Sequence, residues 1–190
     1  MGPSTSPDTG SVILVGLMGV GKSSIGKRLA KRLDLPFIDA DMEIAKAAGC
    51  SIEDIFEIYG EDAFREGEQR VINRILNDGP LVLATGGGAF MDASTRSRIH
   101  ESGVSVWLRA SLDVLVRRLG RRVNERPILK DRNLKDALTE LIEIRHPVYA
   151  DADIVIDTGD EPLDSTVEQV CKEIDAFRSR GGRDTGSATP

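Results

Sequence analysis

Cysteine is scarce in this chain. The 190 residues include only Cys50 and Cys171, which lie far apart and form no CxxC pair. This spacing argues against a disulfide scaffold and against a cysteine-based zinc site. Two isolated cysteines are typical of a protein with reduced thiols, so we expect a cytoplasmic location.

Long apolar runs and an excess of basic residues are also missing. No uninterrupted apolar stretch approaches the roughly 20 residues of a membrane helix, and the N-terminus lacks the basic start and apolar stretch of a signal peptide. Acidic residues outnumber basic ones by 31 to 25, which gives a formal net charge of −6. No general affinity for nucleic acid or anionic lipid follows from this balance. We expect a soluble monomer that binds small molecules, without nucleic-acid or membrane partners.

The length and the 40% hydrophobic content predict one domain. We expect it to span residues 11–178, with disordered tails at 1–10 and 179–190. Short apolar segments alternate with segments of helical periodicity, and they begin near Val12, Phe37, Leu81, Val104 and Ile154. This alternation predicts an α/β fold with a five-stranded, mostly parallel sheet and helices on both faces. The pattern dissolves in a basic stretch, and we expect a mobile lid over about 121–133.

A glycine-rich segment follows the first apolar run. Residues 16–23 read GLMGVGKS and match the phosphate-binding pattern G-x-x-x-x-G-K-[ST]. Glycines let the loop turn its backbone N–H groups toward phosphates, while Lys22 reaches the β and γ oxygens and Ser23 offers a hydroxyl to Mg²⁺. A dinucleotide fingerprint does not fit, because Ser24 stands where that pattern needs glycine. The predicted nucleotide-binding residues are Gly19, Val20, Gly21, Lys22, Ser23 and Ser24.

Further polar residues follow the next strands. Asp39 and Asp41 end the second strand, and the alternation of a strand would place both carboxylates on one side. Gly86, Gly87 and Gly88 follow the third strand. Carboxyl ends of parallel strands share one edge, so we expect these segments to meet there.

Arg65 and Glu68 lie three residues apart on a predicted helix. As an isolated observation, this spacing fits a surface ion pair. In this setting Arg65 suits a bidentate clamp on a carboxylate, with Glu68 orienting it. No N-K-x-D signature of a GTPase is present, so a small-molecule kinase is favoured over a switch.

These segments together resemble the shikimate kinases, which are small relatives of the nucleoside monophosphate kinases. The resemblance covers nearly the whole expected domain, and its motifs are GLMGVGKSS at 16–24, FIDAD at 37–41, FREGE at 64–68, TGGGA at 85–89, RPIL at 126–129 and RHPVY at 145–149. It implies a P-loop kinase that phosphorylates the 3-hydroxyl of shikimate with ATP and Mg²⁺, in aromatic amino-acid biosynthesis.

The resemblance also implies roles for individual residues. Shikimate would be bound by Asp41, Arg65, Gly86, Gly87, Gly88 and Arg145. Ser23 and Asp39 would hold magnesium, and Arg126 in the lid would bind ATP. Lys22, Asp41 and Arg126 would be catalytic, with Asp41 as the candidate base. The family commonly has leucine where Ile128 follows Pro127 here.

Several alternatives stay open from the sequence. Arg121 or Arg122 is a further candidate for contacting ATP. A sibling kinase acting on gluconate or a nucleotide would share the phosphate loop. A catalytically silent regulatory module would also share it, although the presence of Lys22, Ser23 and Asp39 disfavours that reading.

Overall fold

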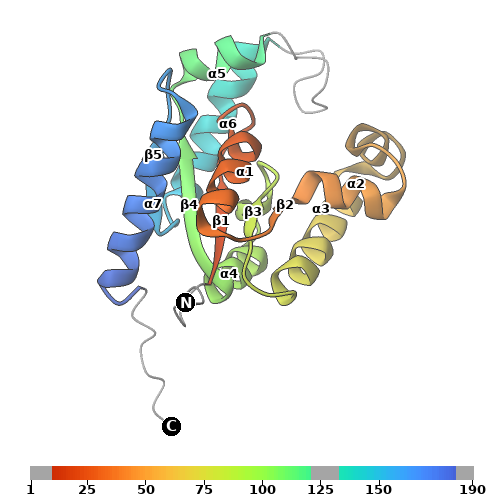
Figure 1. Ribbon diagram of the computed structural model, residues 1–190. Coiled ribbons are helices and arrows are strands. Elements are labelled where there is room, and N and C mark those ends of the chain that lie inside the picture. The colour runs from red at the N-terminus through yellow and green to blue at the C-terminus, as the bar shows by residue number, and fades with distance from the viewer. Residues whose placement is uncertain (1–9, 121–132, 183–190) are drawn as a thin grey trace.

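The computed structural model describes residues 10–120 and 133–182, and its centre is a five-stranded sheet (Figure 1). The strand order is β2-β3-β1-β4-β5, and every neighbouring pair is parallel. The strands are β1 (Ser11–Val15), β2 (Phe37–Asp39), β3 (Val82–Ala84), β4 (Gly103–Arg109) and β5 (Ile154–Asp157). The expected α/β class and strand content are confirmed, and the sheet is parallel throughout.

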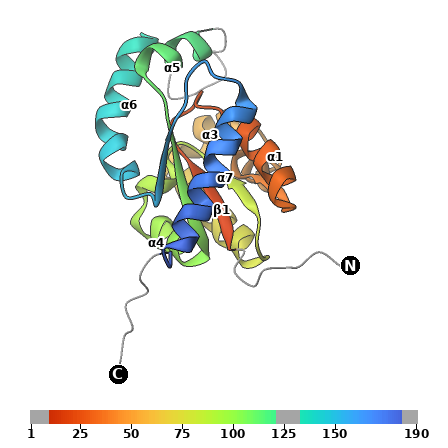
Figure 2. The ribbon, with the colours of Figure 1, turned by 60° about the vertical axis from the view of Figure 1, so that its left-hand side comes forward.

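Helices cover both faces of this sheet. Helices α1 and α7 lie on one face, whereas α4 and α6 lie on the other (Figure 2). The helices are α1 (Lys22–Leu33), α2 (Ala40–Ala48), α3 (Ile52–Asn77), α4 (Ala93–Ser102), α5 (Leu112–Leu119), α6 (Leu134–Tyr149) and α7 (Leu163–Ser179), with a 3-10 turn η1 at Ala89–Met91. The sequence analysis did not anticipate η1. None of the described helices is long and apolar enough to cross a membrane.

The apolar segments of the sequence form the hydrophobic core. Strands β1 and β3 are buried along their whole length, as continuous apolar segments covered on both faces should be. On α1, Ile25 and Leu29 are 1% and 0% exposed, so this apolar side of the helix is buried. Burying a side chain of this size contributes about 1.5–3 kcal/mol.

Helix α3 has a defined start and an internal break. The Ser51 hydroxyl accepts a hydrogen bond from the Asp54 N–H at 3.0 Å, and the Asp54 carboxylate accepts one from the Ser51 N–H at 3.1 Å. The two bonds form a capping box. Gly60 has φ 83° and ψ 175°, so the helix is kinked there. Two helical segments of α3 therefore meet at Gly60.

The strand-based placement of Asp41 is wrong. Strand β2 ends at Asp39, and Asp41 lies in the first turn of α2. The reason is a cap: the Asp39 carboxylate accepts a hydrogen bond from the Asp41 N–H at 3.1 Å, which starts the helix immediately. The alternation of a strand does not apply across that boundary.

The last described helix lies at the C-terminal side of the chain. Helix α7 runs to Ser179, and the backbone N–H of Gly182 still donates to the carbonyl of Phe177, so ordered structure continues past residue 178. Most of the expected lid, with Arg126, Arg121 and Arg122, lies outside the described residues.

Candidate active site

The register of the sheet brings the three sequence motifs to one edge. Asp39 pairs with Ala84, and Ala84 pairs with Leu14, so the ends of β2, β3 and β1 are level. The chain segments that leave these ends line a pocket of about 630 Å³. Lys22 and Arg65 both line it, as do the two aspartates and the glycine triplet. The predicted convergence of distant motifs is confirmed.

The phosphate loop forms one side of this pocket. Gly19 and Gly21 have φ of 82° and 100°, a region that side chains with a Cβ disfavour, so the loop needs glycine at both positions. Lys22 Nζ donates to the carbonyls of Gly16 and Leu17 at 2.7 and 2.9 Å. Val20 does not line the pocket, because its side chain is 2% exposed and packs in the core. The loop therefore presents backbone and the Lys22 amine toward an anion.

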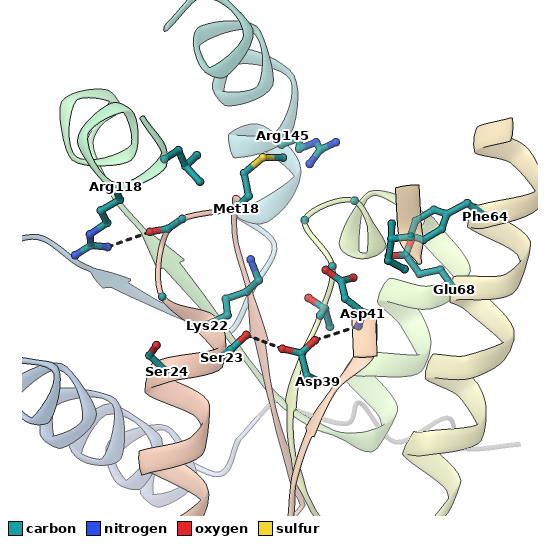
Figure 3. A pocket seen from close by; sticks show the side chains of 18 of the residues that line it. Met18, Lys22, Ser23, Ser24, Asp39, Asp41, Phe64, Glu68, Arg118 and Arg145 are labelled. Carbon is teal, nitrogen blue, oxygen red and sulfur yellow. Dashed lines mark hydrogen bonds between the residues drawn. The ribbon is translucent and has the colours of Figure 1, made fainter. Parts of the chain in front are cut away.

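Ser23 and Asp39 are joined at the floor of the pocket. The Ser23 hydroxyl donates to the Asp39 carboxylate at 2.6 Å, and Figure 3 shows this bond beside Lys22. Hydroxyl and carboxylate oxygens are ligands that Mg²⁺ prefers. The described residues contain no cluster of three His, Cys, Asp or Glu side chains suited to a metal. The pair fits an ion that keeps phosphate and water ligands as well.

Arg65 forms the opposite side with two carboxylates. Its Nη1 lies 2.6 Å from the buried Glu68 carboxylate, and its Nη2 lies 3.2 Å from Glu61, which is exposed. A Cβ on Gly88 would approach the guanidinium to 2.4 Å, so any larger residue there would have to displace the Arg65 side chain. Burial disfavours the charged guanidinium, but Glu68 and Glu61 outweigh burial and raise the pKa of Arg65. Arg65 is thus a partly buried cation that Glu68 orients, and not a surface ion pair.

Glu68 and Asp41 approach each other across Gly86. A Cβ on Gly86 would lie 2.6 Å from Glu68 Oε1 and 2.8 Å from Asp41 Oδ1. Glu68 is 3% exposed, and its Oε1 has no hydrogen-bond partner among the described residues. Burial raises the pKa of Glu68 against the opposing effect of Arg65, and the Asp41 charge raises it further. This side of the pocket therefore holds several closely spaced charged groups around Gly86.

Arg145 enters the same pocket from α6. It is 7% exposed, and a Cβ on Gly87 would lie 3.0 Å from its Nη1. Figure 3 shows Arg145 above the loop that carries the glycines, with Asp41 and Glu68 below. Two guanidinium groups therefore flank the glycine triplet from α3 and α6.

Sequence reasoning missed Arg118 and Thr85. Arg118, in the last turn of α5, lines the pocket and donates to the carbonyls of Gly19 and Val20 at 3.3 and 3.2 Å. Its position just before the expected lid was the available signal. Thr85 lines the pocket between β3 and the glycines, and its hydroxyl donates to the Leu14 carbonyl at 2.9 Å. Both side chains fix the backbone of the pocket wall.

Comparison with known proteins agrees with this geometry. The family model described as shikimate kinase matches residues 18–175. Shikimate kinase of Bradyrhizobium diazoefficiens is 52% identical over 166 residues, which cover 87% of this chain and 80% of that protein. That of Caulobacter vibrioides is 54% identical over 160 residues, which cover 84% and 80%.

Solved structures give the same result. Shikimate kinase from Acinetobacter baumannii in complex with shikimate has a TM-score of 0.85 and 34% identity, over 89% of this chain and 94% of that chain. A gluconokinase from Sinorhizobium meliloti has a TM-score of 0.60 at 21% identity, which shows a shared fold. The family model matches most of the chain, and the relatives are more than 50% identical to it. The chain therefore belongs to the shikimate kinase family.

Proposed function

We propose that this protein transfers the γ-phosphoryl group of ATP to the 3-hydroxyl of shikimate. The observation that carries the proposal is that Lys22 and Arg65 line one pocket, on opposite sides of it. A phosphate loop on one side and a carboxylate-binding arginine on the other suit direct transfer between two bound substrates. Family membership supports the identity of the acceptor.

The nucleotide half consists of the phosphate loop and the start of α1. The N-terminus of a helix attracts anions, and Lys22 adds a positive charge for the β and γ oxygens. Lys22 would leave the carbonyls of Gly16 and Leu17 to reach them. Ser23 and Asp39 would hold Mg²⁺, which neutralises charge on the phosphates when bound.

The acceptor half consists of Arg65, Arg145, Asp41 and the glycine triplet. The two guanidinium groups would bind the substrate carboxylate, while Asp41 accepts hydrogen bonds from ring hydroxyls. The 3-hydroxyl oxygen forms a bond to the γ-phosphorus, and the bond from that phosphorus to the β–γ bridging oxygen breaks. The hydroxyl proton passes to Asp41, and ADP leaves. Positioning and electrostatic stabilisation provide most of the rate in such transfers.

Arg126 is a further part of the proposal. It lies outside the described residues, and its role rests on the RPIL segment that resembles the family. We propose that it stabilises charge on the transferring group, as an arginine finger does. Fingers of this kind are worth about 10³–10⁵ in rate, so Arg126→Ala should lower kcat by roughly that factor.

A coupled assay of ADP release tests the proposed reaction. We expect Mg²⁺-dependent ADP release that saturates with shikimate, and phosphorus NMR should identify one phosphate ester. Gluconate and a nucleoside monophosphate serve as competing acceptors. Turnover with either of these, and none with shikimate, would point to a sibling kinase. Binding of ATP and shikimate without turnover would instead favour the silent regulatory module. We also propose that the protein is a cytoplasmic monomer. Size-exclusion chromatography with light scattering tests the oligomeric state.

A further inference from the structure

Tyr149 is a buried polar side chain that contacts the glycine triplet, and the reaction above gives it no role. It ends α6, and its exposed fraction is 0%. Its ring centroid lies 5.8 Å from that of Trp107 and 6.4 Å from that of Phe90. This aromatic packing holds the ring in one place, so the hydroxyl at its tip has a fixed position.

The hydroxyl of Tyr149 donates a hydrogen bond to the carbonyl oxygen of Gly87. Burial raises the pKa of Tyr149 to about 12, against the opposing effect of the nearby Arg145. The phenol therefore keeps its proton at any pH at which the protein works, and it remains a donor. Removing this donor would leave a buried carbonyl without that bond, a change that costs more than the bond itself contributes.

Gly87 occupies the junction between the two halves of the pocket. A Cβ on Gly87 would lie 3.0 Å from Arg145 Nη1, and 3.6 Å from the Gly16 carbonyl oxygen. That same Gly16 carbonyl accepts the hydrogen bond from Lys22. The peptide that Tyr149 holds is thus packed between the acceptor arginine and the phosphate loop.

Tyr149 and Arg145 are also linked through α6. They are four residues apart, so they lie on the same face of the helix. One helix therefore delivers both the guanidinium beside Gly87 and the hydroxyl that binds the Gly87 carbonyl. A shift of the loop away from Tyr149 would change the distance between Arg145 and the glycines as well.

From this geometry we propose that Tyr149 is a positioning residue that fixes the glycine triplet relative to the phosphate loop, and thereby sets the affinity for the acceptor and its alignment for transfer. The proposal rests on the proposed function. It assigns no direct contact between Tyr149 and substrate, because the phenol acts through the Gly87 peptide.

Steady-state kinetics of Tyr149→Phe test this role, because the substitution removes only the hydroxyl. We expect KM for shikimate to rise roughly 3- to 10-fold, the range for one buried hydrogen bond. We expect kcat to fall as well, since misalignment slows transfer, while KM for ATP changes by less than about 2-fold. Tyr59 is the other tyrosine of the chain and is 65% exposed, so Tyr59→Phe is the matched control and should match wild type.

The outcomes separate this role from a purely structural one. A lower Tm with unchanged KM for shikimate and unchanged kcat would overturn the proposal, because the hydroxyl would then serve only stability. An equal rise in KM for both substrates would overturn it too. If wild type itself shows no turnover with shikimate, the proposed function fails instead, and the two failures are distinct.

A spectroscopic measurement covers the case in which Tyr149→Phe does not fold. In the Tyr59→Phe background Tyr149 is the only tyrosine, so 3-fluorotyrosine labelling gives a single fluorine resonance. We expect shikimate to shift this resonance more than an ATP analogue does. A fluorine chemical shift that does not change at a saturating concentration of shikimate would contradict the coupling of Tyr149 to the acceptor site.

Discussion

At the scale of single residues, the arrangement of Arg65 underlies the proposed binding of the substrate carboxylate. Its guanidinium is held by Glu68 at 2.6 Å inside the protein and by Glu61 at 3.2 Å near solvent. Truncation to alanine should remove the charge-assisted hydrogen bonds to the substrate carboxylate, each worth about 1.5–3 kcal/mol. For Arg65→Ala we expect shikimate affinity to fall about 10- to 100-fold with ATP affinity retained, as measured by calorimetry.

A control for this prediction is available on the same helix. Arg70 is exposed and donates to the backbone carbonyl of Glu66. Arg70→Ala should leave shikimate affinity unchanged. Wild-type shikimate affinity in Arg65→Ala would refute the carboxylate clamp.

Glu68 makes stability depend on pH in a definite direction. Its pKa is raised in the folded protein from an ordinary value of 4.5, chiefly by burial. The folded state therefore binds the proton more tightly than the unfolded state does, and this contribution to stability is lost as pH rises from about 4.5 through the raised pKa. The stability of wild type relative to Glu68→Gln should fall over that range, as measured by urea unfolding at a series of pH values.

Taking the difference in unfolding free energy between wild type and Glu68→Gln cancels the contributions of other titrating groups. Glu66→Gln, at an exposed glutamate of the same helix, is the control. Two other results would contradict the prediction: the stability difference between wild type and Glu68→Gln stays constant across pH, or it moves in favour of wild type as pH rises. Either result would show that the ion pair with Arg65 outweighs the burial of Glu68.

At the scale of elements, the two glycines of α3 have opposite roles. Gly60 has φ 83° and ψ 175°, a conformation essentially restricted to glycine, whereas Gly67 lies in regular helix. A Cβ would meet nothing within 4 Å at either position, so only backbone preference decides the outcome. Gly60→Ala should destabilise the protein by about 1–3 kcal/mol. Gly67→Ala should stabilise it by about 0.5–1 kcal/mol.

Thermal unfolding of these two variants measures both effects. Stability changes of opposite sign in the two variants would exclude a general effect of adding a methyl group to α3. Equal changes in Tm would mean that the kink at Gly60 is not a property of the protein in solution. Helix α3 carries Arg65 and Glu68 after the kink, so Gly60→Ala should also raise KM for shikimate.

At the scale of the whole molecule, the two proposed binding half-sites at the edge of the sheet should respond separately to their ligands. A ligand at 100 times its Kd stabilises the folded state by about 2.7 kcal/mol, which is visible as a rise in Tm. We expect both shikimate and an ATP analogue with Mg²⁺ to raise the Tm of wild type. Lys22→Ala should lose mainly the nucleotide shift together with turnover, and Arg65→Ala should lose the shikimate shift.

This pattern tests the division of the pocket. Loss of both shifts in either variant would mean that the two sides are not independent binding sites. Retention of the nucleotide shift in Lys22→Ala, with turnover abolished, would place the contribution of Lys22 in transfer rather than in binding.

Local patterns were sufficient to predict the strands and most of the helices. The glycine spacing of the phosphate loop, the Ser51 capping box and the apolar runs of β1 and β3 depend on neighbouring residues, so the sequence alone determines them. The phosphate loop and the start of α1 form one continuous segment.

The tertiary structure decided what depends on contacts between distant segments. The alternation rule misplaced Asp41, because an aspartate cap ended β2 and started α2. The burial of Glu68, the bond from Tyr149 to Gly87 and the contact of Arg118 with the phosphate loop each join segments far apart in the chain. The sequence determined which chemical groups this protein brings to its site. The packing of α3, α5 and α6 around the sheet decided their distances and protonation, because burial and through-space charge have no signature in local order.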